Sequence, residues 1–114
     1  MTSTIYKIVS REEWTVAESV GEYRGSALDV ADGFIHLSSP QQTVDTAAKY
    51  FADRDDLLLV SVDVASLGST LRWEASRGGD LFPHVYGVLP LMAVAEVFAL
   101  ERMPNGKHQF PDGF

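Results

Sequence analysis

The sequence contains no cysteine, and this absence excludes a disulfide framework, thiolate catalysis and zinc sites built from pairs of cysteines. It also fits a reducing compartment. The first residues, MTSTIYKIVSREEW, lack the basic and apolar regions of a signal peptide. No apolar run approaches the roughly 20 residues of a membrane span. We therefore expect a cytoplasmic protein with no membrane partner.

Positive charge is also scarce. Nine lysine and arginine residues stand against sixteen aspartate and glutamate residues, which gives a formal net charge of -7. Binding to DNA or RNA gains much of its affinity from the release of phosphate counterions, and this requires a basic face. None of the nine cations forms a run. We expect no nucleic acid polymer as a partner, although a single nucleotide remains compatible with the sequence.

The chain is long enough for one domain. It has 114 residues, of which 46% are hydrophobic, and it shows no linker, repeat or low-complexity segment. A chain of this length buries about two-thirds of its unfolded surface when it folds. We therefore expect residues 1–114 to form a single domain that ends in a turn-rich tail over 103–114. The sequence leaves the oligomeric state open.

Capping patterns predict two main helices. Ser10 and Glu13 have the spacing of a capping box, and Gly21 stands where the first helix would end. Ser39 is a good N-cap for the second helix, which continues to about residue 51. Its apolar residues recur at helical spacing and predict one buried stripe. The stripe consists of Val44, Ala47, Ala48 and Phe51.

Between these helices, Ser26 and Asp29 could cap one short helical turn. The remaining segments that are rich in β-branched and aromatic residues predict strands. They are residues 4–9, 34–37, 57–64, 71–75, 84–89 and 93–101. The segment 57–64 is almost continuously apolar, which is typical of a central strand. Because the helices come early and the strands crowd the second half, the order favours an α+β fold over a wound parallel sheet.

Histidine provides the first candidate chemistry. His36 and Phe34 share one face of the predicted strand 34–37, and Ser38 follows on the same face. Histidine exchanges protons near neutral pH and often acts as a general acid or base. The alternative is a histidine at the edge of the core that bonds one backbone carbonyl. His108 lies in the turn-rich tail, where we expect a surface residue.

The stretch LRWEASRGGDLFPHVYG, residues 71–87, concentrates ionisable side chains. In a hairpin, Arg72 and Glu74 would share one strand face, and His84 and Tyr86 would share another. One interpretation is a solvated hairpin whose surface ion pair contributes about 0–1 kcal/mol. The other is one wall of a site.

Two arginines next to glycines indicate anion binding. Arg77 precedes two glycines, whose backbone amides can approach an anion closely. An arginine fork can hold a phosphate or carboxylate through two hydrogen bonds. Arg24 and Ser26 surround another glycine in the same way. A flexible loop tip explains both stretches without a ligand.

Metal binding and serine hydrolysis have weaker support. His36, His84 and Glu74 are ligand types for zinc or iron. Their positions do not show the short histidine spacing typical of such sites, so we expect no metal. The sequence also lacks the G-x-S-x-G elbow that exposes a nucleophilic serine.

Several stretches together resemble a known family. IYKI, GEYRGSALDVADGFIHLSSPQQ, LRWEASRGG and FPHVYG occur in this order. On these motifs the chain is identified as a member of the small bacterial family called domain of unknown function 952, over about residues 4–100. The resemblance names no reaction.

The stretch DGFIHLSSPQQTVDTAAKYF is similar in layout to a segment of poly(ADP-ribose) polymerases: a strand, a serine-bearing turn, then a helix with small residues and an aromatic. This distant resemblance to the ADP-ribosyltransferase fold implies a split, mainly antiparallel sheet and a cleft for NAD or ADP-ribose. In that pattern, Lys7 stands where those enzymes have histidine or arginine. Ser38 matches their serine, while Asp80 or His84 stands near their glutamate.

These observations combine into one hypothesis, a cleft that binds a small anionic or nucleotide-like molecule. Residues 72–86 would form one wall, and Tyr86 would contact the ligand. Arg77 and Arg24 would hold an anionic group. His36 and His84 would exchange protons, while Glu74 would orient a histidine or a sugar hydroxyl. The opposite wall would carry Lys7, Arg24, Ser26, His36 and Ser38. The alternative is a non-catalytic binding or interaction module on a transferase-like scaffold, so whether the protein is an enzyme stays open.

Overall fold

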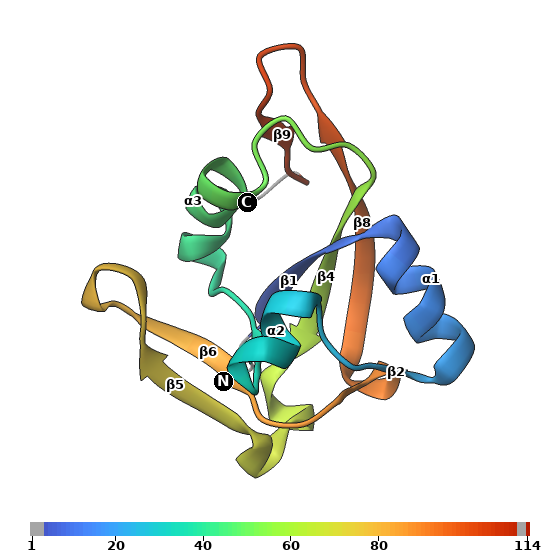
Figure 1. Ribbon diagram of the computed structural model, residues 1–114, viewed down its shortest axis with the longest axis vertical. Helices are drawn as coiled ribbons and strands as arrows, with labels where there is room; N and C mark the ends of the chain where they lie inside the picture. The colour runs from blue at the N-terminus through green and yellow to red at the C-terminus, as the bar shows by residue number, and fades with distance from the viewer. Residues whose placement is uncertain (1–3, 112–113) are drawn as a thin grey trace.

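Two antiparallel sheets meet at a single backbone bridge (Figure 1). The computed structural model describes residues 4–111 and 114. The larger sheet has the order β1-β4-β8-β9, with bounds Thr4–Ser10, Leu57–Asp63, Val94–Arg102 and His108–Gln109. The smaller sheet has the order β3-β6-β5, with bounds Ile35–His36, Leu81–Val85 and Leu71–Ala75. A third, two-stranded sheet pairs β2, Glu22–Tyr23, with β7, Leu89–Pro90.

Three α-helices accompany the sheets: α1, Arg11–Val20; α2, Ala27–Asp32; and α3, Pro40–Tyr50. Single turns of 3-10 helix occupy Val64–Ser66, Gly68–Thr70, Arg77–Gly79 and Leu91–Ala93. The predicted α+β class with mainly antiparallel strands is confirmed. The two predicted main helices are α1 and α3, and the predicted short turn is the six-residue α2. None of the helices in the described ranges has both the length and the apolar content to cross a bilayer.

Strand β4 lies between β1 and β8, and residues 57–62 are all buried. Its alternate side chains face two separate cores. Leu57 and Leu59 pack in the core that α3 covers with Ala47. The positions between them face the core that α1 covers with Trp14. The predicted central position of this strand is confirmed.

Helix α3 buries a different face from the predicted one. Among the four residues of the predicted stripe, only Ala47 is buried, and Val44 is 50% exposed. Thr43 is fully buried instead, because its hydroxyl donates a hydrogen bond to the Ser39 carbonyl at 2.7 Å and is therefore satisfied within the helix. The apolar pattern treated threonine as a surface residue, so the predicted stripe began at Val44 and not at the neighbouring Thr43.

The later part of the chain also differs in two details. The segment predicted as one strand over 84–89 is divided between β6, Leu81–Val85, and β7, Leu89–Pro90. Pro83 therefore lies inside β6, where its carbonyl accepts a hydrogen bond from the Leu37 N–H at 3.0 Å. His108 is buried, which makes the surface prediction wrong. Its Nε2 lies 2.8 Å from the Arg54 carbonyl oxygen, because β9 folds back along β8 and carries the ring inward.

Strand β1 and the segment that follows β3 touch at one point and then part. Tyr6 and Ser38 exchange two backbone hydrogen bonds, both of 2.8 Å. A regular antiparallel ladder would place Ile8 opposite His36 as the next pair on this side. The ladder is not continued, and His36 is paired only on its other side, with His84 of β6. The opening between the two sheets begins at this point.

The buried face of α3 can be tested by a pair of substitutions. We expect Val44→Ser to change the free energy of unfolding by less than about 0.5 kcal/mol, because the side chain is already in solvent. Ala47→Leu should destabilise the protein by about 1–3 kcal/mol, because it overfills a closed core. Urea denaturation of both variants measures the difference, and the reverse order would contradict the observed face.

Candidate functional site

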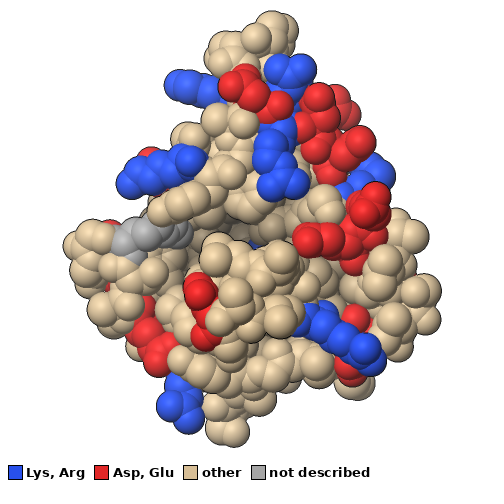
Figure 2. All heavy atoms as spheres, in the orientation of Figure 1, with Lys and Arg blue, Asp and Glu red and all other residues tan. Residues whose placement is uncertain are grey.

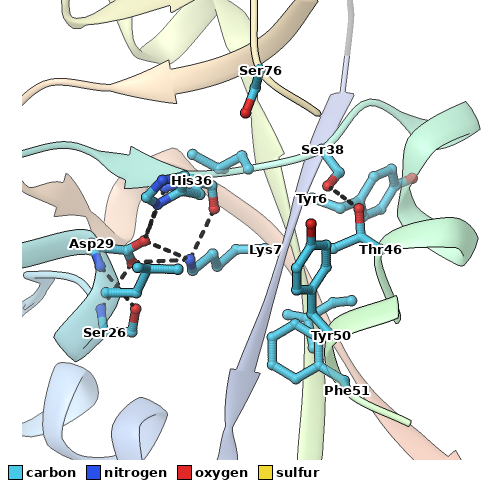
Figure 3. Close-up of a pocket in the computed structure, with 13 residues that line it drawn as sticks. Tyr6, Lys7, Ser26, Asp29, His36, Ser38, Thr46, Tyr50, Phe51 and Ser76 are labelled. Carbon is cyan, nitrogen blue, oxygen red and sulfur yellow. Dashed lines mark hydrogen bonds and ion pairs between the residues drawn. The ribbon is translucent and has the colours of Figure 1, made fainter. Parts of the chain in front are cut away.

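One buried ion pair occupies the point where the sheets part (Figure 3). Lys7 Nζ lies 2.9 Å from Asp29 Oδ2 and 3.2 Å from Oδ1. The same ammonium donates to the His36 carbonyl at 2.9 Å, and the His36 N–H donates to Asp29 Oδ1 at 3.1 Å. The pair therefore satisfies both backbone groups of His36 that would otherwise bond Ile8 in a continuous ladder.

The sequence around α2 positions the carboxylate. Asp29 Oδ2 accepts a hydrogen bond from the Ser26 N–H at 2.8 Å, and the Ser26 hydroxyl accepts one from the Asp29 N–H at 3.2 Å. This reciprocal capping box begins the helix. Gly25, with a φ of 106°, lies directly against the Asp29 side chain, and a Cβ there would come within 2.8 Å of Asp29 Cβ. The predicted cap is confirmed, and the cap also holds the counter-ion of Lys7.

Burial and pairing act in opposite directions on the two charges. Burial alone would raise the pKa of Asp29, but the Lys7 ammonium and the hydrogen bonds from His36 and Ser26 outweigh it and lower the pKa. Burial lowers the pKa of Lys7, and the attraction of Asp29 offsets this only in part. The lysine thus carries an amine that gives up its proton more readily than a surface lysine does.

His36 lies between two carboxylates. Its Nδ1 is 2.6 Å from Asp29 Oδ1, and its Nε2 is 3.0 Å from Asp32 Oδ2. A neutral imidazole has a single N–H and can donate to only one of them at a time. Asp29 is buried while Asp32 is exposed. The ring can therefore pass a proton between the interior and the solvent.

A cavity of about 270 Å³ opens beside this network. Figure 2 shows the corresponding face of the molecule hollowed near its centre. Three aromatic rings form much of the lining, those of Tyr6, Tyr50 and Phe51. The hydroxyls of Ser38 and Thr46, 3.1 Å apart, add polar groups to the wall. The complete lining is Tyr6, Lys7, Ile8, Ser26, Leu28, Asp29, His36, Leu37, Ser38, Thr46, Tyr50, Phe51 and Ser76.

A second cluster lies on the β5–β6 hairpin. Glu74 Oε1 is 2.8 Å from His84 Nδ1 and accepts a hydrogen bond from the Tyr86 hydroxyl at 2.8 Å. These two hydrogen bonds lower the pKa of Glu74, and the one from Tyr86 raises the pKa of the phenol. Arg72 lies over the Tyr86 ring, and Phe34 stacks on His84 with ring centroids 4.2 Å apart.

The structure therefore divides the predicted site residues into two groups. Lys7, Ser26, His36 and Ser38 line the cavity. Glu74, His84 and Tyr86 form the second cluster instead. Arg24 is at the surface with its Nε 2.9 Å from Glu22 Oε2, so it does not contribute to the described lining. The side chain of Arg77 lies outside the described residues, and its anion-binding role stays a prediction.

The two histidines that were predicted to exchange protons are close but separately placed. Their ring centroids are 5.5 Å apart, and Phe34 lies against both rings. Only His36 reaches the cavity. The segment 72–86 contributes Ser76 to the described lining, rather than a wall. Within the described ranges, no three histidine or carboxylate side chains converge so as to hold a metal ion.

Sequence reasoning missed the roles of three residues at this site. Asp29 was recognised as a helix cap, but nothing in its spacing indicated that it would meet Lys7, 22 positions earlier. Asp32 was not considered as a site residue, whereas its carboxylate lies 3.0 Å from the His36 ring. Tyr50 was outside the predicted apolar stripe of α3 and was not considered as a site residue, whereas it lines the cavity.

The Asp29 carboxylate can be tested against its exposed counterpart. We expect Asp29→Asn to cost about 3–5 kcal/mol of unfolding free energy at pH 7, because it leaves the Lys7 charge buried and unpaired. Asp32→Asn, the matched change on the other side of the His36 ring, should cost less than about 1 kcal/mol. Equal losses from the two variants would contradict the central place of Asp29.

The lowered pKa of Asp29 also predicts how the free energy of unfolding depends on pH. Because the folded pKa of Asp29 is lowered, its stabilising contribution is complete above the unfolded pKa of about 3.9 and is lost as the pH falls through the folded value. Denaturation between pH 3 and pH 7 should therefore show a smaller loss of stability on acidification in Asp29→Asn than in the unmodified protein.

Comparisons with known proteins agree with the fold and the motifs. Residues 8–97 match the family model described as "Protein of unknown function (DUF952)". The crystal structure of protein CC0527 from Caulobacter crescentus is 47% identical, has a TM-score of 0.90, and the match covers 94% of each chain. The solution NMR structure of CC0527 is likewise 47% identical, with a TM-score of 0.84 and coverage of 93% of this chain and 91% of that one. No curated protein matches the chain. The chain belongs to the DUF952 family of proteins of unknown function.

Proposed function

We propose that the cavity binds a small planar ring that carries an amide, such as the nicotinamide ring of NAD, as part of a nucleotide-like ligand. The observation that carries this proposal is the open edge of β1 beside an aromatic-lined cavity. The polar network of Lys7, Asp29 and His36 closes one side of that cavity. A concave, mainly apolar pocket with a few convergent polar groups is the usual form of a small-molecule site.

The open strand edge supplies directional hydrogen bonds. The backbone groups of Tyr6 face β3, where they bond Ser38. Backbone groups alternate sides along a strand, so the N–H and C=O of Ile8 point the same way, into the opening where β3 has departed. A carboxamide carries one acceptor and two donors, and it can bond such a donor and acceptor together.

The size and charge of the cavity favour a ring over a phosphate. Drug-sized ligands occupy pockets of about 300–1,000 Å³, so a cavity of about 270 Å³ suits one ring, with the rest of a dinucleotide lying across the rim. Asp29 neutralises Lys7, which is the only cation in the described lining. An anionic group would therefore bind outside the cavity.

The split between β1 and β3 also supports kinship with the ADP-ribosyltransferase fold. Its catalytic pattern is only partly matched, because Lys7 stands at the place of a histidine or arginine and Ser38 alone agrees in type. His36 can supply acid–base chemistry at the cavity wall through Asp29 and Asp32. Ligand binding is therefore our main proposal, and a divergent NAD-handling reaction is the second.

Thermal shift with nicotinamide, NAD, ADP-ribose and inorganic phosphate tests this function. A ligand at 100 times its dissociation constant adds about 2.7 kcal/mol to the free energy of unfolding. In a domain of this size, the Tm should rise by on the order of 10 °C. We expect shifts with nicotinamide and NAD and none with phosphate.

Two tyrosines provide matched variants. Tyr50 lines the cavity and Tyr86 belongs to the second cluster, and both are exposed in the fold. Tyr50→Ala should remove most of the shift, whereas Tyr86→Ala should retain it. The opposite result would indicate that the ligand binds at the second cluster on the hairpin and not in the cavity. An absence of any shift would favour the alternative, a non-catalytic interaction module.

A further inference from the structure

We propose that Lys7 is a nucleophile that forms a covalent imine with an aldehyde or ketone held in the cavity. The proposal uses the cavity of the proposed function but goes beyond ligand binding. It rests on an amine that lines the cavity, on the directions in which that amine is already bonded, and on the acid–base groups around it.

The hydrogen bonds of Lys7 leave one position on its nitrogen available. The nitrogen has three tetrahedral positions besides its carbon. The Asp29 oxygens at 2.9 and 3.2 Å belong to one carboxylate and subtend far less than a tetrahedral angle, so together they take one position. The His36 carbonyl takes the second. The third carries a proton in the ammonium form and a lone pair in the free amine.

The surroundings favour the free amine more than a surface position would. Lys7 is only 8% exposed, and burial lowers the pKa of its side chain. Desolvation of this kind is the common way in which proteins activate lysine toward carbonyl compounds. Asp29 contacts both the lysine nitrogen and the His36 ring, so the proton that leaves the amine has a continuous path to Asp32 and solvent.

The step balances without any further reactant. The free amine attacks the carbonyl carbon, a C–N bond forms, and the carbonyl electron pair moves to oxygen, which takes the proton that the ammonium released. The nitrogen then loses its second proton to the Asp29 carboxylate. Asp29 passes this proton to the hydroxyl group, which leaves as water. The lysine ammonium and the carbonyl compound thus become a protonated imine and one water molecule, and the Asp29 carboxylate pairs with the imine as it did with the ammonium.

The cavity defines the class of substrate. Its aromatic lining and volume suit a carbonyl group attached to a single planar ring or to an open-chain sugar of similar size. A bulky or highly charged carbonyl compound would not fit beside Tyr50 and Phe51, where the described lining has no uncompensated cation.

Reductive trapping tests the proposal on the whole protein. Pyridine-3-carbaldehyde has the ring of nicotinamide and a reactive carbonyl, and cyanoborohydride at pH 7 converts its imines into stable amines. The chain has three lysines, Lys7, Lys49 and Lys107. Lys49 and Lys107 are exposed and serve as internal controls. Peptide mapping by mass spectrometry should find Lys7 modified at least tenfold faster than either, and excess nicotinamide should slow only Lys7.

Labelling of Lys7 no faster than of Lys49 and Lys107 would overturn the proposal. If nicotinamide raises the Tm but the aldehyde does not modify Lys7 selectively, the proposed binding in the cavity is supported and the proposed role of Lys7 as nucleophile is wrong. Selective labelling without a nicotinamide shift would support the nucleophile and contradict amide recognition. Lys7→Arg keeps a cation against Asp29 but removes the amine, so labelling should fall to that of the two surface lysines. Unfolding in urea should abolish the selectivity for Lys7.

Discussion

The ion pair between Lys7 and Asp29 occupies the point where the backbone pairing that begins between Tyr6 and Ser38 is not continued. Strand β1 forms a bridge at Tyr6 with Ser38, just after the end of β3, and the two segments then separate. The two backbone groups of His36 at the separation are bonded by the carboxylate and the ammonium. Buried backbone groups must be paired, so the opening between the sheets depends on this pair. The cavity, the free edge of β1 and the orientation of His36 all follow from it.

A buried ion pair is a costly replacement for the backbone hydrogen bonds of a continuous strand pair, because both charges lose their hydration. The desolvation of two charges often cancels their attraction, and apolar residues of the same shape can be equally stable. Here the same Asp29 oxygen meets the lysine, the His36 backbone and the His36 ring. One carboxylate therefore holds the lysine, the histidine and the start of helix α2 together. Perturbed ionisable groups beside a cavity are typical of functional sites, and this arrangement is the basis of both proposals.

The hairpin of β5 and β6 shows how a concentration of charged residues can mislead. Its ionisable side chains satisfy one another, since Glu74 bonds both His84 and Tyr86 while Arg72 covers the phenol ring. The alternating pattern gave the correct faces of the strands but not what those faces contact. Phe34 lies against both histidine rings, but of the two histidines only His36 lines the cavity.

The sequence by itself determined the local structure. Capping residues such as Ser10, Ser26 and Ser39 begin the three helices, because these signals act over three or four positions. Continuous apolar character made β4 central. The motifs also identified the family. Only the tertiary structure decided which side chains meet, because Lys7, Asp29 and His36 come from separate elements whose separation along the chain carries no pattern. It also decided that Thr43 and His108 are buried, since each finds its hydrogen-bond partner only in the folded chain.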